Sequence, residues 1–130
     1  MTPAGKTILV VEDDLDLAKM MKRLLEGQGY RVLLAADGVS GVDAAVAERP
    51  DLILLDIKLP KLDGELVAVE LRGRTETAQI PIIMVTAVTD LADKHLAAQL
   101  GALEYVEKPF ESDQLLARIR LILSQKPAPA

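Results

Sequence analysis

The sequence predicts an α/β fold in which a doubly wound parallel sheet of five strands is covered by five helices. Short apolar runs alternate with longer segments of helical period five times along the chain. Most of the runs are continuously apolar, which is typical of strands buried on both faces. Half of the residues are apolar but only three are aromatic, so an aliphatic core with closely approaching helices is expected. A chain of 130 residues has room for one such domain.

The expected strands are the five apolar runs themselves. They span Thr7–Val11, Arg31–Ala35, Leu52–Leu55, Ile82–Val85 and Leu103–Val106. Parallel neighbours need a crossover connection of about a dozen residues or more, and each gap between the runs is long enough to hold a helix. The sequence therefore favours repeated strand-helix units over hairpins.

The first and last helices are predicted from apolar residues at a spacing of three and four. The first should bury Leu17, Met20, Met21, Leu24 and Leu25 and end near Gly27–Gly29. The last should begin after an N-cap at Ser112 and bury Leu115, Ile119, Ile122 and Leu123, with Leu121 off this face. The other three are expected at Val39–Arg49, Gly64–Arg72 and Asp90–Leu100, the last ending at Gly101. Met84 is expected in the core.

Residues 1–124 are expected to form the domain, and residues 125–130 a flexible tail. Pro127 and Pro129 prevent that tail from continuing a helix. The Met1 start and the short tail favour a stand-alone chain.

Composition excludes several classes of function. The chain has no cysteine, so disulfides and thiolate metal sites are excluded and a cytoplasmic location is expected. No apolar run approaches the ~18 residues that span a bilayer, and no signal peptide is present, so no membrane contact is expected. The net charge is −5 and the 15 Lys and Arg residues are scattered, so direct binding of nucleic acid is not expected.

Polar side chains follow four of the five strands, at the edge where open parallel sheets bind ligands. They are Glu12, Asp13 and Asp14 after the first strand, Asp56 after the third, Thr86 after the fourth and Lys108 after the fifth. In a flavodoxin-like strand order of 2-1-3-4-5, the first and third strands are neighbours, and Asp13 would face Asp56. Two carboxylates ~4 Å apart repel by about 4 kcal/mol at an effective dielectric of 20, so the pair needs a proton or a cation.

Oxygen ligands without His or Cys favour Mg²⁺. Lys108 and Thr86 add a cation and a hydroxyl donor that would suit the oxygens of a phosphoryl group. A carboxylate nucleophile, a metal and two oxyanion partners together indicate phosphoryl transfer onto Asp56. Each residue alone has a commoner structural role, such as a helix cap for Asp13 or Asp14, but the combination favours one chemical site.

Four blocks of the sequence resemble the response-regulator receiver domains of two-component signal transduction, of the single-domain, chemotaxis-regulator-like kind. The blocks are residues 8–14 (ILVVEDD), 51–64 (DLILLDIKLPKLDG), 81–87 (PIIMVTA) and 101–110 (GALEYVEKPF). They occur in the family's order and at its spacings along nearly the whole chain.

The resemblance implies a phosphorylation-dependent switch rather than an enzyme, although such domains promote their own phosphotransfer and dephosphorylation. Asp56 matches the phosphoacceptor. Glu12, Asp13, Asp56 and the backbone carbonyl of Lys58 match the Mg²⁺ ligands, Thr86 and Lys108 match the residues that bind phosphoryl oxygens, and Thr86 and Tyr105 match the switch pair.

The implied partners are a histidine kinase or a histidine phosphotransfer protein as phosphoryl donor. A downstream effector or a second copy would bind the face formed by Asp90–Leu100, Leu103–Val106 and the last helix. In the family this face changes when the site is phosphorylated.

Two alternatives use a related site or fold. A haloacid-dehalogenase-like phosphatase would need a second Asp two residues after the nucleophile, where this chain has Lys58, and its nucleophile would follow the first strand. A flavodoxin-like electron carrier would need a Ser, Thr and Gly loop after the first strand, where three acids would repel a flavin phosphate. Both alternatives are disfavoured.

Overall fold

The computed structural model describes residues 5–56, 64–86, 104–107 and 110–124. For Gly64, Glu65, Thr86, Glu104, Tyr105 and Glu107 it describes the backbone alone. The predicted helix at Asp90–Leu100, its end at Gly101 and the tail of residues 125–130 lie outside the described residues.

Five parallel strands form one sheet in the order β2-β1-β3-β4-β5, as the sequence predicted. The strands are β1 (Thr7–Val11), β2 (Arg31–Ala35), β3 (Leu52–Leu55), β4 (Ile82–Thr86) and β5 (Glu104–Glu107). The first three match the predicted ranges. β4 and β5 each continue one residue further than predicted, to Thr86 and Glu107, because these two residues pair with each other. Leu103, the predicted start of the fifth strand, lies outside the described residues. Chain order reverses between β1 and β3, so the site-bearing ends of these two strands are neighbours.

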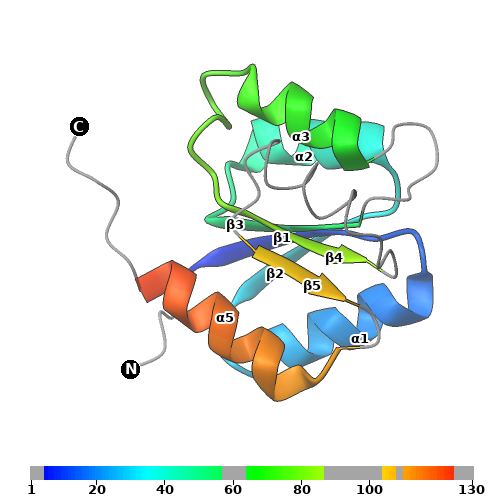
Figure 1. Cartoon of the computed structure of the whole chain (residues 1–130), viewed down its shortest axis with the longest axis vertical. Helices are drawn as coiled ribbons and strands as arrows, with labels where there is room; N and C mark the ends of the chain where they lie inside the picture. The colour runs from blue at the N-terminus through cyan, green and yellow to red at the C-terminus, as the bar shows by residue number, and fades with distance from the viewer. Residues whose placement is uncertain (1–4, 57–63, 87–103, 108–109, 125–130) are drawn as a thin grey trace.

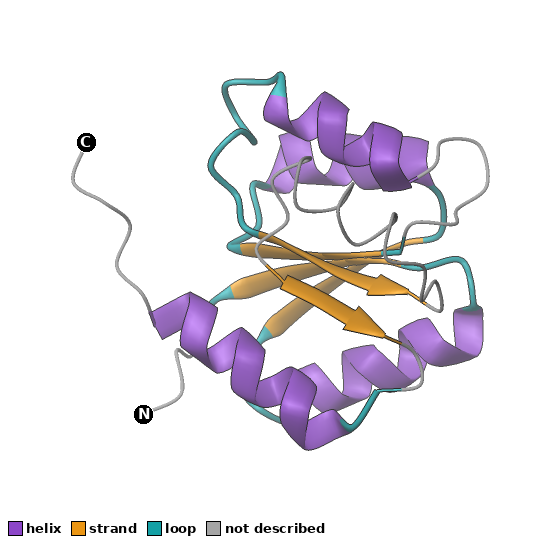
Figure 2. Cartoon of the chain, in the orientation of Figure 1, coloured by secondary structure: helices purple, strands orange, loops and turns teal. Residues whose placement is uncertain are grey.

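Helices cover both faces of the sheet and make three layers (Figures 1 and 2). The described helices are α1 (Leu15–Glu26), α2 (Gly38–Glu48), α3 (Gly64–Arg72) and α5 (Ser112–Ser124). α1 and α5 pack on one face, and α2 and α3 lie side by side on the other. None of the helices in the described ranges has the length and apolar content needed to cross a bilayer.

Alternate side chains along β1 pack into the two layers of the core, one on each face of the sheet. Leu9 and Val11 join the cluster under α2 and α3, whereas Ile8 and Val10 join the cluster under α1 and α5. All four are at most 1% exposed, which explains why this strand reads as a continuous apolar run.

Three helix boundaries differ from the sequence prediction by one residue. α2 begins at Gly38 instead of Val39, because its N-cap is Asp37. α2 ends at Glu48, because Arg49 adopts a left-handed backbone conformation with φ 46° and caps the helix. α5 includes Ser112 as its first residue instead of beginning after it.

The prediction that Met20 belongs to the core is wrong, because its side chain is 44% exposed. The buried positions of α1 are Ala18, Met21 and Leu25, at the spacing of one helical face. Met20 lies about 100° around the helix from Met21, which turns it to solvent. Met84 is buried as predicted, and Leu121 is exposed as predicted.

A glycine allows α2 to lie directly on the strand that carries the acidic residues. A Cβ atom on Gly41 would stand 2.9 Å from Cγ1 of Val11. Val11 is the last residue of β1, immediately before Glu12. The close approach therefore fixes the strand end from which the site residues extend.

Candidate metal site at the carboxyl edge of the sheet

Main-chain hydrogen bonds align the ends of β1 and β3. The parallel register pairs Val11 with Leu55, so the next residues, Glu12 and Asp56, leave the sheet side by side. The Asp56 N–H donates to the carbonyl oxygen of Val11 at 3.1 Å, and the Glu12 N–H donates to that of Ala35 at 2.9 Å. The backbone that carries both acids is therefore part of the sheet's hydrogen-bond ladder.

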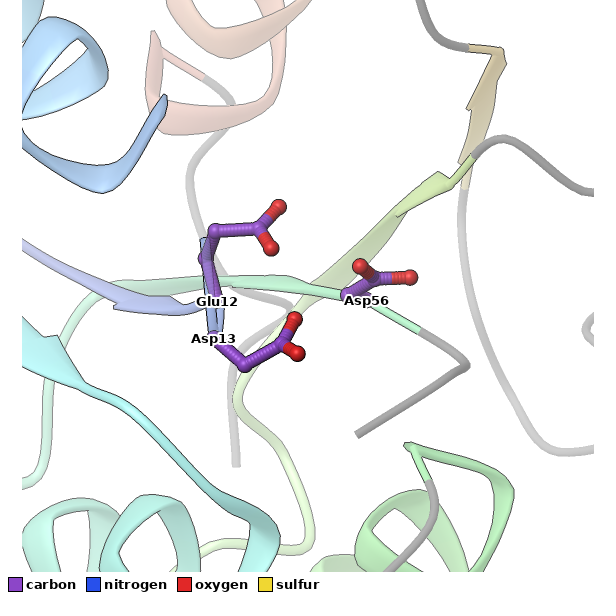
Figure 3. A group of neighbouring side chains, drawn as sticks. All are labelled: Glu12, Asp13 and Asp56. Atoms are coloured by element: carbon purple, nitrogen blue, oxygen red, sulfur yellow. The ribbon is translucent and has the colours of Figure 1, made fainter. Parts of the chain in front are cut away.

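Three carboxylates meet at this edge. Glu12, Asp13 and Asp56 each offer an oxygen, and the three oxygens lie within 4.8 Å of one another. Figure 3 shows the side chains of Glu12 and Asp13, at the end of β1, pointing toward the side on which Asp56 lies. Glu12 and Asp56 are 4% and 6% exposed, whereas Asp13 is exposed. Glu12 and Asp56 adjoin apolar residues of the core: Val10, Val11, Met21, Leu54, Leu55 and Val85.

The donor set fits a small hard cation. All three groups are carboxylates, and their oxygens lie close enough together, within 4.8 Å, for one cation to contact all three. The exposure of Asp13 leaves one side of the cluster open to water, and Mg²⁺ usually retains several water ligands in proteins. A cation would also relieve the repulsion between three neighbouring negative charges.

The third acid of the Glu12-Asp13-Asp14 run has a different place. Asp14 is the N-cap of α1, where its Oδ1 accepts the N–H of Leu17 at 3.2 Å. Its own N–H donates to Oε2 of Glu12 at 3.1 Å. The capping role that the sequence left open for Asp13 or Asp14 therefore falls to Asp14.

Four predicted site residues are described in part or not at all. Lys58 and Lys108 lie outside the described residues. The backbone of Thr86 ends β4 opposite Glu107 of β5, and the backbone of Tyr105 pairs with Met84, but the side chains of Thr86 and Tyr105 are not described. The roles of these four residues stay predictions.

Sequence reasoning missed two features that support the acids. It did not foresee that the Asp14 N–H binds Glu12, although the spacing from Asp14 to Leu17 is that of a helix cap. It also gave Gly41 no role, because a glycine within a helical segment carries no sign in the sequence of the strand that it will contact.

Known proteins resemble the chain over most of its length. Residues 8–120 match the model of the response regulator receiver domain. Among curated relatives, a probable transcriptional regulator, ycf27, of Cyanophora paradoxa is 43% identical over 95% of this chain and 51% of its own length. The DNA-binding dual master transcriptional regulator RpaA of Synechocystis is 42% identical over 89% of this chain and 48% of its own length. The chain thus spans about half the length of these relatives.

Solved receiver-domain structures also resemble the chain. The receiver domain of the sensor histidine kinase PA1611 from Pseudomonas aeruginosa, solved with a magnesium ion in its active site cleft, has a TM-score of 0.87 and 35% identity. It covers 94% of this chain and all of that chain. The BeF3-activated receiver domain of Klebsiella pneumoniae RstA has a TM-score of 0.86 and 33% identity, over 92% of this chain and all of that chain.

Proposed function

The chain belongs to the response regulator receiver domain family, and from that premise we propose that it is a phosphorylation switch whose acceptor is Asp56. The observation that carries the proposal is the meeting of Glu12, Asp13 and Asp56 at the carboxyl edge of β1 and β3. Of the three acids, Asp56 alone follows the central strand of the sheet. We propose residues 1–124 as the receiver unit.

Phosphoryl transfer needs a nucleophilic oxygen and compensation for the charge of the phosphoryl group. An Oδ atom of Asp56 attacks the phosphorus atom of a phosphohistidine, the bond from phosphorus to nitrogen breaks, and the histidine nitrogen leaves with the electron pair. The main chain of Asp56 is bonded to β1, so the backbone from which the nucleophilic carboxylate extends is held in place at the edge of the sheet.

Glu12, Asp13, Asp56 and the backbone carbonyl of Lys58 would hold Mg²⁺. When bound, the ion neutralises negative charge between the acceptor carboxylate and the phosphoryl oxygens. The magnesium ion in the receiver domain of PA1611 supports this assignment, as does the all-oxygen donor set of this chain. Thr86 and Lys108 would bind the other phosphoryl oxygens.

The output of the switch is proposed to pass through Thr86 and Tyr105. The phosphoryl group would draw the Thr86 hydroxyl inward, and the ring of Tyr105 would follow, which changes the face that includes β5 and α5. A histidine kinase or phosphotransfer protein would supply the phosphoryl group, and an effector or a second copy would bind the changed face. With a net charge of −5, the domain would act through such a partner and not bind nucleic acid itself. It would also promote its own dephosphorylation.

The test is intact-mass spectrometry after incubation with acetyl phosphate, with and without Mg²⁺. The wild-type chain should gain one phosphoryl group only when Mg²⁺ is present, and Asp56→Asn should gain none. Asp51→Asn is the matched control: Asp51 stands at the other end of the same strand, so its variant should still be modified. An adduct on Asp56→Asn, or none on the folded wild-type chain, would contradict the proposal.

A further inference from the structure

We propose that Asp14 is a positioning residue for the metal site, which acts by restraining the carboxylate of Glu12. Its side chain fixes the first turn of α1, and its backbone N–H, held by that cap, binds Glu12. The inference rests on the proposed function, because it concerns the same metal site.

The first step is the anchoring of Asp14 to the helix. Its backbone is extended, with φ −74° and ψ 105°, as in a helix N-cap. Its Oδ1 accepts the Leu17 N–H at 3.2 Å, and its carbonyl accepts the Ala18 N–H at 2.9 Å. Two separate bonds thus tie this residue to the first turn of α1, whose inner face is buried at Ala18, Met21 and Leu25.

A hydrogen bond connects the anchored backbone of Asp14 to a carboxylate of the metal site. The Asp14 N–H donates to Oε2 of Glu12 at 3.1 Å. Glu12 is 4% exposed, so water cannot easily replace a lost hydrogen bond to its carboxylate. Only residues 12–14 connect β1 to α1, so a shift of the uncapped first turn moves this N–H directly.

Asp14 is placed to act through Glu12 and not as a ligand. The clustered oxygens come from Glu12, Asp13 and Asp56, whereas Oδ1 of Asp14 is turned toward the helix. Removing a group that orients a metal ligand typically weakens metal binding by about 10- to 100-fold. An exposed charge near the site acts more weakly, because salt screens it.

The chain offers a matched control at the next helix. Asp37 caps α2 in the same way, with its Oδ1 accepting the Ser40 N–H at 2.8 Å. Asp37 follows β2 and is not among the clustered carboxylates. Asp37→Ala therefore removes an equivalent cap while leaving Glu12 and its N–H donor in place.

The experiment measures Mg²⁺ dissociation constants by isothermal titration calorimetry for wild type, Asp14→Ala, Asp14→Asn and Asp37→Ala. Asp14→Ala should bind Mg²⁺ about tenfold more weakly. Asp14→Asn keeps the capping oxygen and should stay within about threefold of wild type at ~0.15 M salt. Asp37→Ala should bind as wild type does, while its melting temperature in the absence of Mg²⁺ falls about as much as that of Asp14→Ala.

Three results would overturn the positioning role while leaving the metal site intact. The first is an Mg²⁺ affinity of Asp14→Ala equal to that of wild type. The second is a loss of Mg²⁺ affinity in Asp14→Asn as large as in Asp14→Ala, which would indicate a pure charge effect. The third is an equal loss of affinity in Asp37→Ala, which would indicate general destabilisation. A wild-type chain that binds no Mg²⁺ would instead defeat the proposed metal site itself, and this inference with it.

Discussion

The two edges of the sheet use aspartate in opposite ways. At the amino edge, Asp51 precedes β3, and its Oδ2 accepts the Thr7 N–H at 2.7 Å while Oδ1 lies 3.9 Å from Nζ of Lys6. At the carboxyl edge, Asp56 follows the same strand and lies among other carboxylates. One edge places a carboxylate beside a cation and an N–H group of its own chain, and the other gathers negative charge.

The polar contacts at the amino edge stabilise the fold, whereas the carboxylates at the carboxyl edge form the candidate metal site. The amino edge also holds the entry to β4, where the guanidinium of Arg72 donates to the carbonyl oxygens of Ala78 at 3.0 Å and Ile80 at 2.9 Å. At the carboxyl edge the three neighbouring carboxylates repel one another, and a bound cation would relieve that repulsion. Substitutions at the two edges should therefore have opposite effects on stability.

The largest expected effect is at Arg72. The loop before β4 is held by hydrogen bonds from Arg72 to three of its carbonyl oxygens and by the bond from the buried Thr77 hydroxyl to the carbonyl of Leu71. Arg72→Met removes the guanidinium donor and should lower the free energy of unfolding by about 2–3 kcal/mol. Urea denaturation measures the change. Arg74→Met is the control, because Arg74 pairs with Glu70 on the exposed surface and its loss should cost less than about 0.5 kcal/mol. Equal losses in both variants would refute the structural role given to Arg72.

A smaller loss is expected at Asp51. Asp51→Ala removes the acceptor of the Thr7 N–H and should destabilise the domain by about 1 kcal/mol. Asp51→Asn retains an acceptor oxygen and loses only the exposed ion pair with Lys6, so its stability should stay near that of wild type. If Asp51→Ala were stabilising, the two edges would not differ as described.

A gain in stability is expected at the other edge. Asp13→Asn removes one of three neighbouring charges and should stabilise the Mg²⁺-free domain by about 0.5–1 kcal/mol, the amount small because Asp13 is exposed. Saturating Mg²⁺ should reverse the order, since the ion stabilises the wild type more than the variant. Thermal melts with and without Mg²⁺ test both signs, and a variant that is less stable without Mg²⁺ would contradict the account.

The smallest effect is expected at Tyr30, just before β2. Its hydroxyl is the buried side-chain atom without a hydrogen-bond partner among the described residues, so Tyr30→Phe should change stability by less than about 0.5 kcal/mol at pH 7. Burial raises the pKa of the Tyr30 phenol above 10.0, with partial opposition from Arg120.

The direction in which Tyr30 makes stability depend on pH follows from its pKa in the folded and unfolded chain. Above pH 10 the unfolded chain loses a proton that the folded chain retains, so stability is present below that pH and falls as the pH rises through the folded-state pKa. Tyr30→Phe should lack this contribution to alkaline unfolding, which urea denaturation between about pH 9 and pH 11 measures. An identical decline in both proteins would show that Tyr30 makes no such contribution.

Much of the fold could be predicted because periodic burial leaves a direct record in the sequence. β1 and β3 are buried on both faces, so each strand coincides with an apolar run in the sequence and its range could be predicted. Met20 was misplaced because adjacent apolar residues in a helix satisfy the same spacing rule, and only packing decides which of Met20 and Met21 is buried.

The site was predictable where its parts follow strand ends. The register of β1 and β3 makes two distant sequence positions neighbours, which is why Asp13 and Asp56 could be grouped beforehand. The place of Glu12 among the metal ligands was predicted only through the resemblance to receiver domains. The bond from Asp14 to Glu12 could not be predicted, because it depends on the path of three residues between a strand and a helix, which no periodicity encodes.

The most direct test of the division between the two edges is a Mg²⁺ titration followed by amide NMR. Saturable shifts are expected at Glu12, Asp13, Asp14 and Asp56, while Thr7 and Asp51 at the amino edge should not change. Asp13→Asn should require a higher Mg²⁺ concentration for the same shifts. Shifts of equal size at Thr7 and Asp51, or no shifts at the clustered carboxylates, would contradict this division.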